Sequence, residues 1–208
     1  MNTEIIFSEI IPAVIIGYLL GSIPFALVIG KVFYKTDIRQ HGSGNLGGGN
    51  AGRVLGKKAG LSVMTMDILK VALTIFLTSL FAKSETTLVI AGMAAALGHC
   101  FPLFARFKGG KAVATMYGFL FGMMLFASYS PWIFFLPLLG FLVILYIWKI
   151  IAVASIGSAL LVTLFVYLTT DSTAMVIALL IFDVLMVWRH RSNIRRIIRH
   201  EENKISWM

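Results

Sequence analysis

The chain has 208 residues, of which 59% are hydrophobic and only 13% are charged. Soluble domains are about half apolar and about a quarter charged, so this composition excludes an ordinary soluble domain and favours a surface that faces lipid. The net charge of +9 then indicates Lys and Arg gathered on one side of a membrane, rather than a partner nucleic acid. Because Cys100 is the single cysteine, a disulfide within the chain and a cysteine-based metal cluster are excluded.

Seven apolar segments approach the length of about 20 residues that spans a bilayer. The expected helices cover about 5–33, 59–81, 87–104, 112–128, 131–148, 151–169 and 173–187. The segments are continuously apolar, whereas the strands of a membrane barrel would alternate. The connections are short and no repeat is visible, which predicts a single transmembrane domain over 1–208. The predicted fold class is an all-α integral membrane protein, a bundle of seven transmembrane helices.

The basic residues predict the orientation of this bundle. When the connections between the expected helices are assigned alternately to two sides, one side holds only Lys83 and the other holds fifteen Lys and Arg. The fifteen are Lys35, Arg39, Arg53, Lys57, Lys58, Arg106, Lys108, Lys111, Lys149, Arg189, Arg191, Arg195, Arg196, Arg199 and Lys204. Cytoplasmic loops carry an excess of Lys and Arg. We therefore expect an extracytoplasmic N-terminus and a cytoplasmic C-terminus.

Three polar segments fall on the expected cytoplasmic side: HGSGNLGGGNAGR at 41–53, FARFKGGKAVAT at 104–115 and WRHRSNIRRIIRHEE at 188–202. Their glycines allow backbone N–H groups to form an anion-binding concavity. Their Lys and Arg side chains suit phosphate oxygens, and Asn and Ser add neutral donors. A helix that opens near Lys111 would add its dipole to the same site. The segments together predict one cationic site for phosphate groups.

Three competing interpretations concern these polar segments: contacts with lipid headgroups, a dinucleotide site and an ATP site. Headgroups of lipids could account for the exposed charges alone, as at Lys57, Lys58, Arg195, Arg196 and Arg199. That explanation leaves the GSGN and GGK sequences without a purpose. The match of 42–47 to the dinucleotide motif G-x-G-x-x-G lacks a preceding strand, and the P-loop motif fails at Ala105 and Ala112, so neither a dinucleotide nor ATP is indicated.

Ionisable residues also lie inside the expected helices, where they are costly and usually face a polar interior. Asp67 and Lys70 are three residues apart and can pair on one helix face, either as a structural pair or in support of the site. Asp183 lies two turns before His190, on about the same face, and either orients the site or pairs with a neighbouring helix. His99 either satisfies a backbone carbonyl or belongs to the site. His190 and Asn193 are expected on one face of a helix that leaves the membrane.

Several stretches resemble motifs of the bacterial acyl-phosphate:glycerol-3-phosphate acyltransferases, the integral membrane family often called PlsY. The stretches are GSIPFALVIGK at 21–31, GSGNLGGGNAGRVLGKKAG at 42–60, DILK at 67–70, GHCFPLFARFKGGKAVAT at 98–115 and HRSNIRRI at 190–197. They occur in the family's order and cover nearly the whole chain. The resemblance implies seven transmembrane helices in the orientation given above, in the bacterial cell (inner) membrane, with the active site facing the cytoplasm.

The resemblance also implies a reaction. An acyl group passes from acyl phosphate to the 1-hydroxyl of glycerol 3-phosphate, which gives lysophosphatidic acid and phosphate, the first step of phospholipid biosynthesis. The expected partners are these two substrates and membrane lipids, without nucleic acid, metal or another cofactor. Acyl-CoA and acyl carrier protein are not the expected donors.

Residues are carried over from the family's motifs to matching positions. The expected catalytic residues are Ser43, Asn45, Lys111, His190 and Asn193. The expected substrate-binding residues are Gly42, Gly44, Asn50, Arg53, Lys108, Gly109 and Gly110. Arg53 and Lys111 would bind phosphate, while Ser43, Asn45 and Asn193 would orient phosphate and the tetrahedral oxyanion. Either His190 or a phosphate oxygen of the substrate would accept the proton of the attacking hydroxyl, and the acyl tail would lie between helices.

The sequence departs from the family pattern at three positions. Gly49 stands in place of the usual Thr, Ala152 in place of a Ser, and His200 in place of a Gly, whereas Ser155 and Glu202 are retained. These departures leave open a divergent paralogue with altered substrates. An organophosphate transporter is the alternative from another class of function. Such a transporter would favour cationic groups at the membrane centre and two halves of the chain that correspond to each other. A structural or regulatory membrane subunit would leave the polar segments unexplained.

Overall fold

The structure is a computed structural model that describes residues 3–205. Every regular element among these residues is a helix, which confirms the predicted all-α class. The chain divides into two compact units, Met1–Ser128 and Tyr129–Met208. The single domain over 1–208 stays a prediction.

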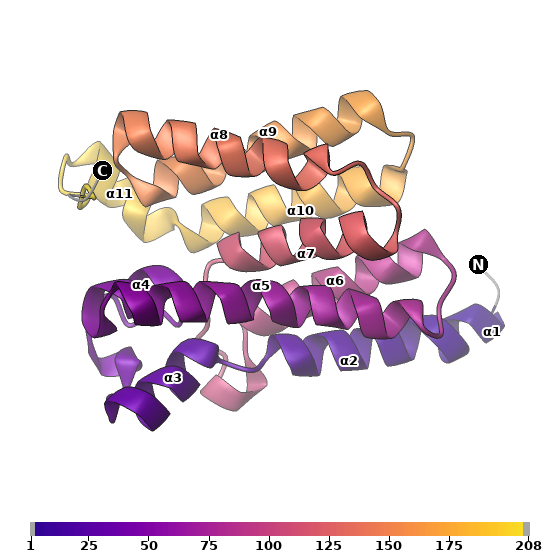
Figure 1. Ribbon diagram of the computed structural model, residues 1–208, viewed down its shortest axis with the longest axis horizontal. Helices are drawn as coiled ribbons and strands as arrows, with labels where there is room; N and C mark the ends of the chain where they lie inside the picture. The colour runs from indigo at the N-terminus through magenta and orange to yellow at the C-terminus, as the bar shows by residue number, and fades with distance from the viewer. Residues whose placement is uncertain (1–2, 206–208) are drawn as a thin grey trace. The chain divides into compact units, whose positions relative to one another are not determined.

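The first unit is built from long helices and several shorter ones (Figure 1). Its elements are α1 (Thr3–Ile5), the π-helical turn η1 (Ile6–Ile10), α2 (Ile11–Gly21), α3 (Phe25–Tyr34), η2 (Ile38–Gln40), α4 (Gly48–Leu55), α5 (Lys57–Ser79), α6 (Glu85–Cys100), η3 (Leu103–Ala105) and α7 (Val113–Phe126). Helix α2 packs on α6, and α5 packs on α4 and α7. A Cβ atom at Gly21 would overlap the backbone of Ala95, so glycine allows α2 and α6 to approach closely.

The first expected helix, about 5–33, is wrong as a continuous element, because α2 ends at Gly21 and α3 begins at Phe25. Pro24 has no N–H for a helical hydrogen bond, and it disfavours helical geometry at Ile23. At the break, the Ile23 carbonyl accepts a hydrogen bond from the side chain of Lys70 in α5. The two helices still form one candidate membrane span, Phe7–Tyr34.

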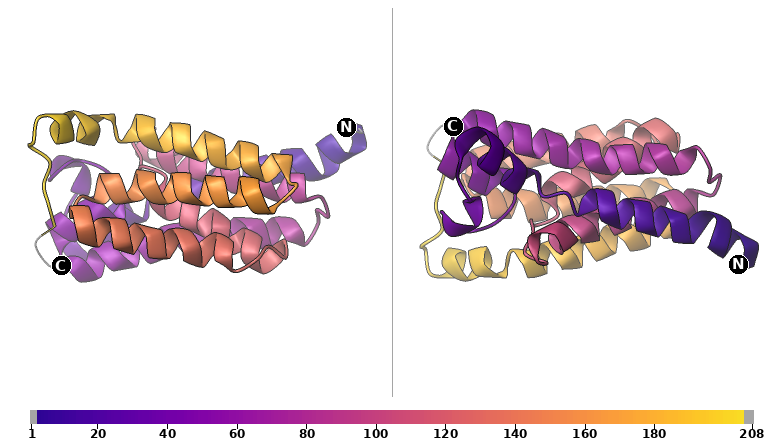
Figure 2. Two further views of the ribbon diagram at one scale, coloured as in Figure 1. Left: turned by 90° about the horizontal axis from the view of Figure 1, so that it is seen from above. Right: turned by 90° about the horizontal axis from the view of Figure 1, so that it is seen from below.

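The second unit contains α8 (Trp132–Trp148), α9 (Ile151–Thr169), α10 (Thr173–Arg189) and α11 (Arg191–Ile198). Helix α9 packs against both α8 and α10, and Figure 2 shows these three helices side by side. The short helix α11 bends away from α10 by 58°. The segment after α11 folds back, and the N–H of Ile205 donates to the carbonyl of Lys149 at 2.8 Å.

Apolar helices long enough to cross a membrane are fewer than the sequence led us to expect. Four described helices qualify by length and composition, or five if the bent pair α10–α11 counts as one span. Helices α7 and α8 are apolar but shorter, with 14 and 17 residues. The polar helix α4 was not expected, since its sequence carries glycines and no long apolar run. The start of α11 was expected only as a continuation of the preceding helix, and not as a separate element.

Candidate functional site

The loop 41–47 in the first unit is organised by the buried side chain of Asn50, which lies in the first turn of α4. Its Oδ1 accepts a hydrogen bond from the Ser43 N–H at 2.9 Å, and its Nδ2 donates to the carbonyls of His41 at 3.1 Å and Ile38 at 3.4 Å. Gly42 adopts φ +60, and a Cβ there would overlap Asn50 Oδ1. Glycine therefore suits this position both by conformation and by space. Asn50, expected to bind substrate, holds the loop that would do so.

Ser43 and Arg53 are exposed and available to a ligand. Ser43 lies in this loop and Arg53 in the last turn of α4. Neither side chain has a hydrogen-bond or ion-pair partner among residues 3–205. A buried polar side chain must be satisfied within the protein, but exposed groups such as these can exchange water for phosphate oxygens.

A second loop, which carries Lys108 to Lys111, is tied to the first. The side-chain Nδ2 of Asn45 donates to the Gly109 carbonyl at 3.1 Å, and the N–H of Gly110 donates to the His99 carbonyl at 3.0 Å. Both glycines are buried, and a Cβ at Gly110 would overlap the His99 imidazole. Lys111 follows directly and is partly buried, two residues before α7 begins at Val113. The structure thus brings the GSGN and GGK segments into contact.

A buried ionic cluster lies behind this second loop. The Lys70 ammonium lies 2.7 Å from Asp67 Oδ1, 2.9 Å from the Ile23 carbonyl and 3.2 Å from His99 Nδ1. His99 Nδ1 is 3.4 Å from the same Asp67 oxygen. The predicted pairing of Asp67 and Lys70 is confirmed. The cluster joins the break between α2 and α3 to α5 and to the end of α6, and His99 extends it to Gly110.

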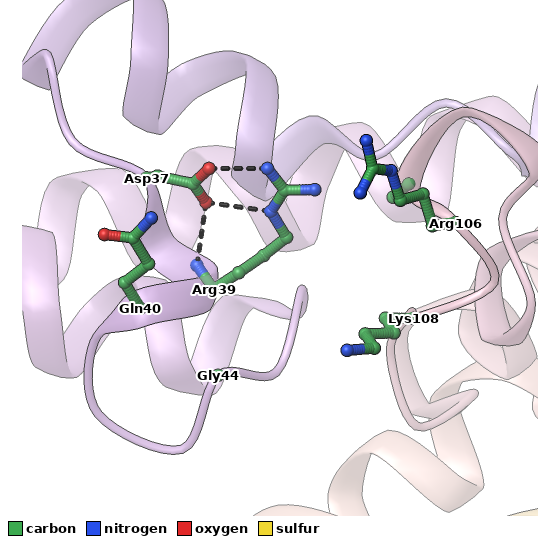
Figure 3. A pocket seen from close by; sticks show the side chains of 7 residues that line it. Asp37, Arg39, Gln40, Gly44, Arg106 and Lys108 are labelled. Carbon is green, nitrogen blue, oxygen red and sulfur yellow. Dashed lines mark hydrogen bonds and ion pairs between the residues drawn. The ribbon is translucent and has the colours of Figure 1, made fainter.

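The turn after η3 and the loop around η2 line an open cavity of about 350 Å³ (Figure 3). Its lining residues are Asp37, Arg39, Gln40, Gly44, Ala105, Arg106 and Lys108. Arg39 grips Asp37 in bidentate fashion, with Nε–Oδ1 at 2.9 Å and Nη2–Oδ2 at 2.6 Å. This hydrogen bonding lowers the pKa of Asp37 to about 2, so its carboxylate stays charged at neutral pH.

An apolar groove runs between α2, α5 and α7 in the same unit and has a volume of about 420 Å³. Its lining is Leu20, Ile23, Phe25, Met66, Leu69, Lys70, Ala72, Leu73, Phe76, Phe121, Leu125 and Phe126. The lining is almost wholly hydrophobic, with Lys70 as its single charged residue. The groove can therefore accept a hydrocarbon chain and offers little to a polar ligand.

The second unit carries the remaining candidate residues, His190 and Asn193. They do not share a straight helix face as expected, because His190 stands at the bend between α10 and α11. Both side chains are buried nonetheless. His190 Nδ1 lies 2.9 Å from the Met186 carbonyl. When Nδ1 carries the proton for that contact, Nε2 is left as the basic nitrogen.

Glu202 is a functional candidate that the sequence reasoning did not assign. Its Oε1 accepts from Asn193 Nδ2 at 2.7 Å, and its Oε2 accepts from Arg196 Nε at 2.6 Å. The carboxylate thus fixes the direction in which the Asn193 amide points. The sequence offered one indication, the Glu retained in the tail motif, but it did not show that this Glu contacts Asn193 and Arg196.

Asp183 pairs with a neighbouring helix, one of its two expected roles. Its Oδ2 accepts a hydrogen bond of 2.8 Å from Thr163 Oγ1, which joins α10 to α9. Within residues 3–205, no group of three His, Cys, Asp or Glu side chains is arranged to hold a metal ion.

Comparison with known proteins relates this arrangement to one family. The family model described as glycerol-3-phosphate acyltransferase matches residues 11–200. The chain belongs to the glycerol-3-phosphate acyltransferase family. It is 45% identical to the glycerol-3-phosphate acyltransferase of Geobacillus kaustophilus over 93% of this chain and 94% of the relative. With the enzyme of Bacillus subtilis the identity is 42%, over 94% of this chain and 97% of the relative.

Two solved structures of PlsY, an integral membrane glycerol 3-phosphate acyltransferase, have a similar fold. The glycerol 3-phosphate form has a TM-score of 0.85 and 34% identity, over 94% of this chain and 95% of that one. The lysophosphatidic acid form has a TM-score of 0.82 over the same shares. The predicted family, enzyme class and multi-pass membrane character are thereby confirmed.

Proposed function

We propose that the protein transfers a fatty acyl group from acyl phosphate to the 1-hydroxyl of glycerol 3-phosphate. The hydroxyl oxygen attacks the acyl carbonyl carbon, the bond from that carbon to the phosphate oxygen breaks, and phosphate leaves. The hydroxyl proton passes to His190 Nε2 or to a phosphate oxygen of the substrate. Family membership supports the acceptor, and the PlsY structures with glycerol 3-phosphate and lysophosphatidic acid support the substrate and product.

One contact carries this proposal: the hydrogen bond from Asn45 to the Gly109 carbonyl. It joins two glycine-rich segments that are 64 residues apart in the chain. A reaction of two phosphorylated substrates needs cations and polar donors in close array. The contact brings Ser43 and Lys111 onto connected loops, where a donor and a cation can act on the same phosphate.

We assign the roles as the motifs suggest. Lys111 and Arg53 bind phosphate and stabilise developing charge, and Lys108 with the glycines Gly42, Gly44, Gly109 and Gly110 shapes the binding loops. Ser43, Asn45 and Asn193 orient the oxyanion. Asn50 keeps the first loop in place, as its three hydrogen bonds indicate.

We further propose seven spans in one domain, with an extracytoplasmic N-terminus, a cytoplasmic C-terminus and the site open to the cytoplasm of a bacterial inner membrane. The fifteen-to-one distribution of Lys and Arg supports this orientation. Helix α8, with 17 residues, lies at the lower end of the spanning range of about 17–25 residues. Helix α7, with 14 residues, would need its flanking residues to complete a span.

The apolar groove between α2, α5 and α7 suits the acyl tail. Its lining is hydrophobic over three helices, so an acyl chain can lie there in surroundings as apolar as the lipid tails. With its acyl tail in the groove, the acyl phosphate would present its phosphate end to the polar loops.

Acyl transfer can be tested with purified protein in detergent, supplied with acyl phosphate and glycerol 3-phosphate. We expect release of phosphate and formation of lysophosphatidic acid, with loss of at least about a hundredfold in kcat/KM on Lys111→Ala or Asn193→Ala. Lys58→Ala is the matched control, since Lys58 is exposed and lies outside the proposed site. Vesicle uptake of glycerol 3-phosphate without acyl transfer would instead identify a transporter.

A further inference from the structure

We propose that Arg39, Arg106 and Lys108 form an additional binding site for the phosphate group of a phosphomonoester, in the cavity between η2 and η3 and next to the proposed active site. Nothing in the reaction described above uses Arg39 or Arg106. The site shares Gly44 and Lys108 with the loops of the proposed active site, whereas its two guanidinium groups, those of Arg39 and Arg106, belong to it alone.

The basic side chains of this cavity converge from two segments. Figure 3 shows Arg106 and Lys108 extending from the turn after η3 toward the loop that carries Asp37 and Arg39. Arg39 uses Nε and Nη2 for Asp37, which leaves Nη1 for a ligand. In the described part of the chain, the side chains of Arg106 and Lys108 have no ion-pair partner. Their mutual repulsion is relieved by an anion between them.

The charge of the lining selects the class of ligand. Three cations and the Asp37 carboxylate leave an excess of two positive charges. A phosphate monoester carries about −1.5 to −2 at neutral pH, whereas a phosphodiester carries a single charge. Two guanidinium groups add bidentate geometry for phosphate oxygens. A volume of about 350 Å³ exceeds the need of one phosphate group and allows the group attached to it to enter.

The turn that presents Arg106 and Lys108 is held by backbone hydrogen bonds. The carbonyl of Pro102 accepts hydrogen bonds from the N–H groups of Ala105 at 3.1 Å and Phe107 at 2.9 Å. Arg106 and Phe107 both adopt left-handed backbone geometry, with φ 55 and φ 59. Two consecutive non-glycine residues in that region are costly. The turn maintains this geometry, which directs Arg106 into the cavity while Ala105 is buried beneath it.

Exposed apolar side chains surround this turn. Leu103, Phe104 and Phe107 are 47%, 57% and 57% exposed. Aromatic and apolar groups beside cations are typical of segments that lie at the membrane interface. A phosphate that reaches the cavity can therefore belong to a lipid, such as phosphatidic acid, or come from the aqueous side.

Two binding experiments distinguish these sources. In the first, detergent-solubilised protein is titrated with phosphatidic acid, and native mass spectrometry gives the dissociation constant of bound lipid. In the second, equilibrium dialysis with labelled inorganic phosphate gives the affinity for the free anion. Both use the Lys111→Ala background, so that phosphate bound by the proposed active site is weakened and a failure of the acyl-transfer proposal does not affect the result.

The deciding variant is Arg106→Gln, with Lys58→Gln as a control that removes the same charge from an exposed position of α5. We expect Arg106→Gln to raise the dissociation constant about tenfold in at least one experiment, Arg106→Lys to retain part of the affinity, and Lys58→Gln to change it by less than about twofold. An effect on phosphatidic acid alone assigns the site to lipid, and an effect on inorganic phosphate assigns it to the aqueous anion. Unchanged affinity in both experiments, or an equal loss with Lys58→Gln, would overturn the proposal.

Discussion

The ammonium of Lys70 lies 3.2 Å from Nδ1 of His99, although the two residues come from different helices. This contact connects charges inside α5 to the loop of Gly109 and Gly110, because the carbonyl of His99 accepts the N–H of Gly110. Buried charges are costly and add little net stability. Their arrangement here indicates that they position the loop.

Removal of one partner from the cluster should therefore be damaging. Lys70→Met leaves the Asp67 carboxylate buried without its cation, and we expect a loss of about 3–5 kcal/mol in the free energy of unfolding. The double variant Asp67→Leu/Lys70→Met should recover much of that stability, as measured by denaturation in detergent. If the cluster positions the loop, the double variant remains low in kcat even though it folds. Wild-type kcat in the double variant would show that the cluster serves stability alone.

The contact between Gly110 and His99 predicts a steric effect. Gly110→Ala places a methyl group against the imidazole, and relief of that overlap must move the loop that carries Lys111. We expect about 1–3 kcal/mol of destabilisation together with a marked loss of kcat/KM. Gly49→Ala is the matched control, because no atom lies within 4 Å of its added methyl. Similar effects from both substitutions would contradict the packing argument.

Glu202 should act on the reaction through Asn193. Glu202→Ala removes the acceptor of both Asn193 and Arg196, so that the Asn193 amide loses its fixed direction. We expect kcat to fall about tenfold or more with a smaller change in KM, and Glu202→Gln to restore part of the loss. Steady-state kinetics separate the effect on kcat from the effect on KM. Glu201→Ala, at an exposed neighbour, should have little effect, and an equal fall there would point to the tail as a whole.

The pair of Asp37 and Arg39 predicts a dependence on pH. The pKa of Asp37 is about 2 in the folded protein against the ordinary 3.8. A carboxyl group whose folded pKa is lowered stabilises the protein fully above its unfolded pKa, and this contribution is lost as pH falls through the folded value. The stability difference between wild type and Asp37→Asn should stay constant from neutral pH to about pH 5 and shrink between about pH 4 and pH 2. Denaturation at a series of pH values tests this, with exposed Asp171→Asn as the control.

The sequence was informative where a single physical preference dominates. Continuous apolar runs predicted α9 at its observed bounds, Ile151–Thr169, and the spacing of Asp67 and Lys70 predicted their pairing. A long apolar helix forms mainly because lipid surrounds it, so a long apolar run in the sequence is enough to predict it. The glycine-rich motifs likewise indicated which loops would meet.

Contacts between distant residues could not be predicted in the same way. Asn50 was expected to bind substrate, but its hydrogen bonds to Ser43 and His41 depend on the path of the loop. The break before Phe25 was missed, although Pro24 was visible, because apolar residues on both sides suggested one continuous helix. Glu202 gave no local indication of Asn193 as its partner, since the tail must fold back for them to meet.

The returning tail has a mechanical consequence. The hydrogen bond from Ile205 to Lys149 fastens the chain to the corner between α8 and α9, so that 199–205 acts as a short strap with Glu202 at its middle. A residue inserted or deleted within 199–205 would shift Glu202 and so change the direction of the Asn193 amide, although every residue that the amide contacts is still present.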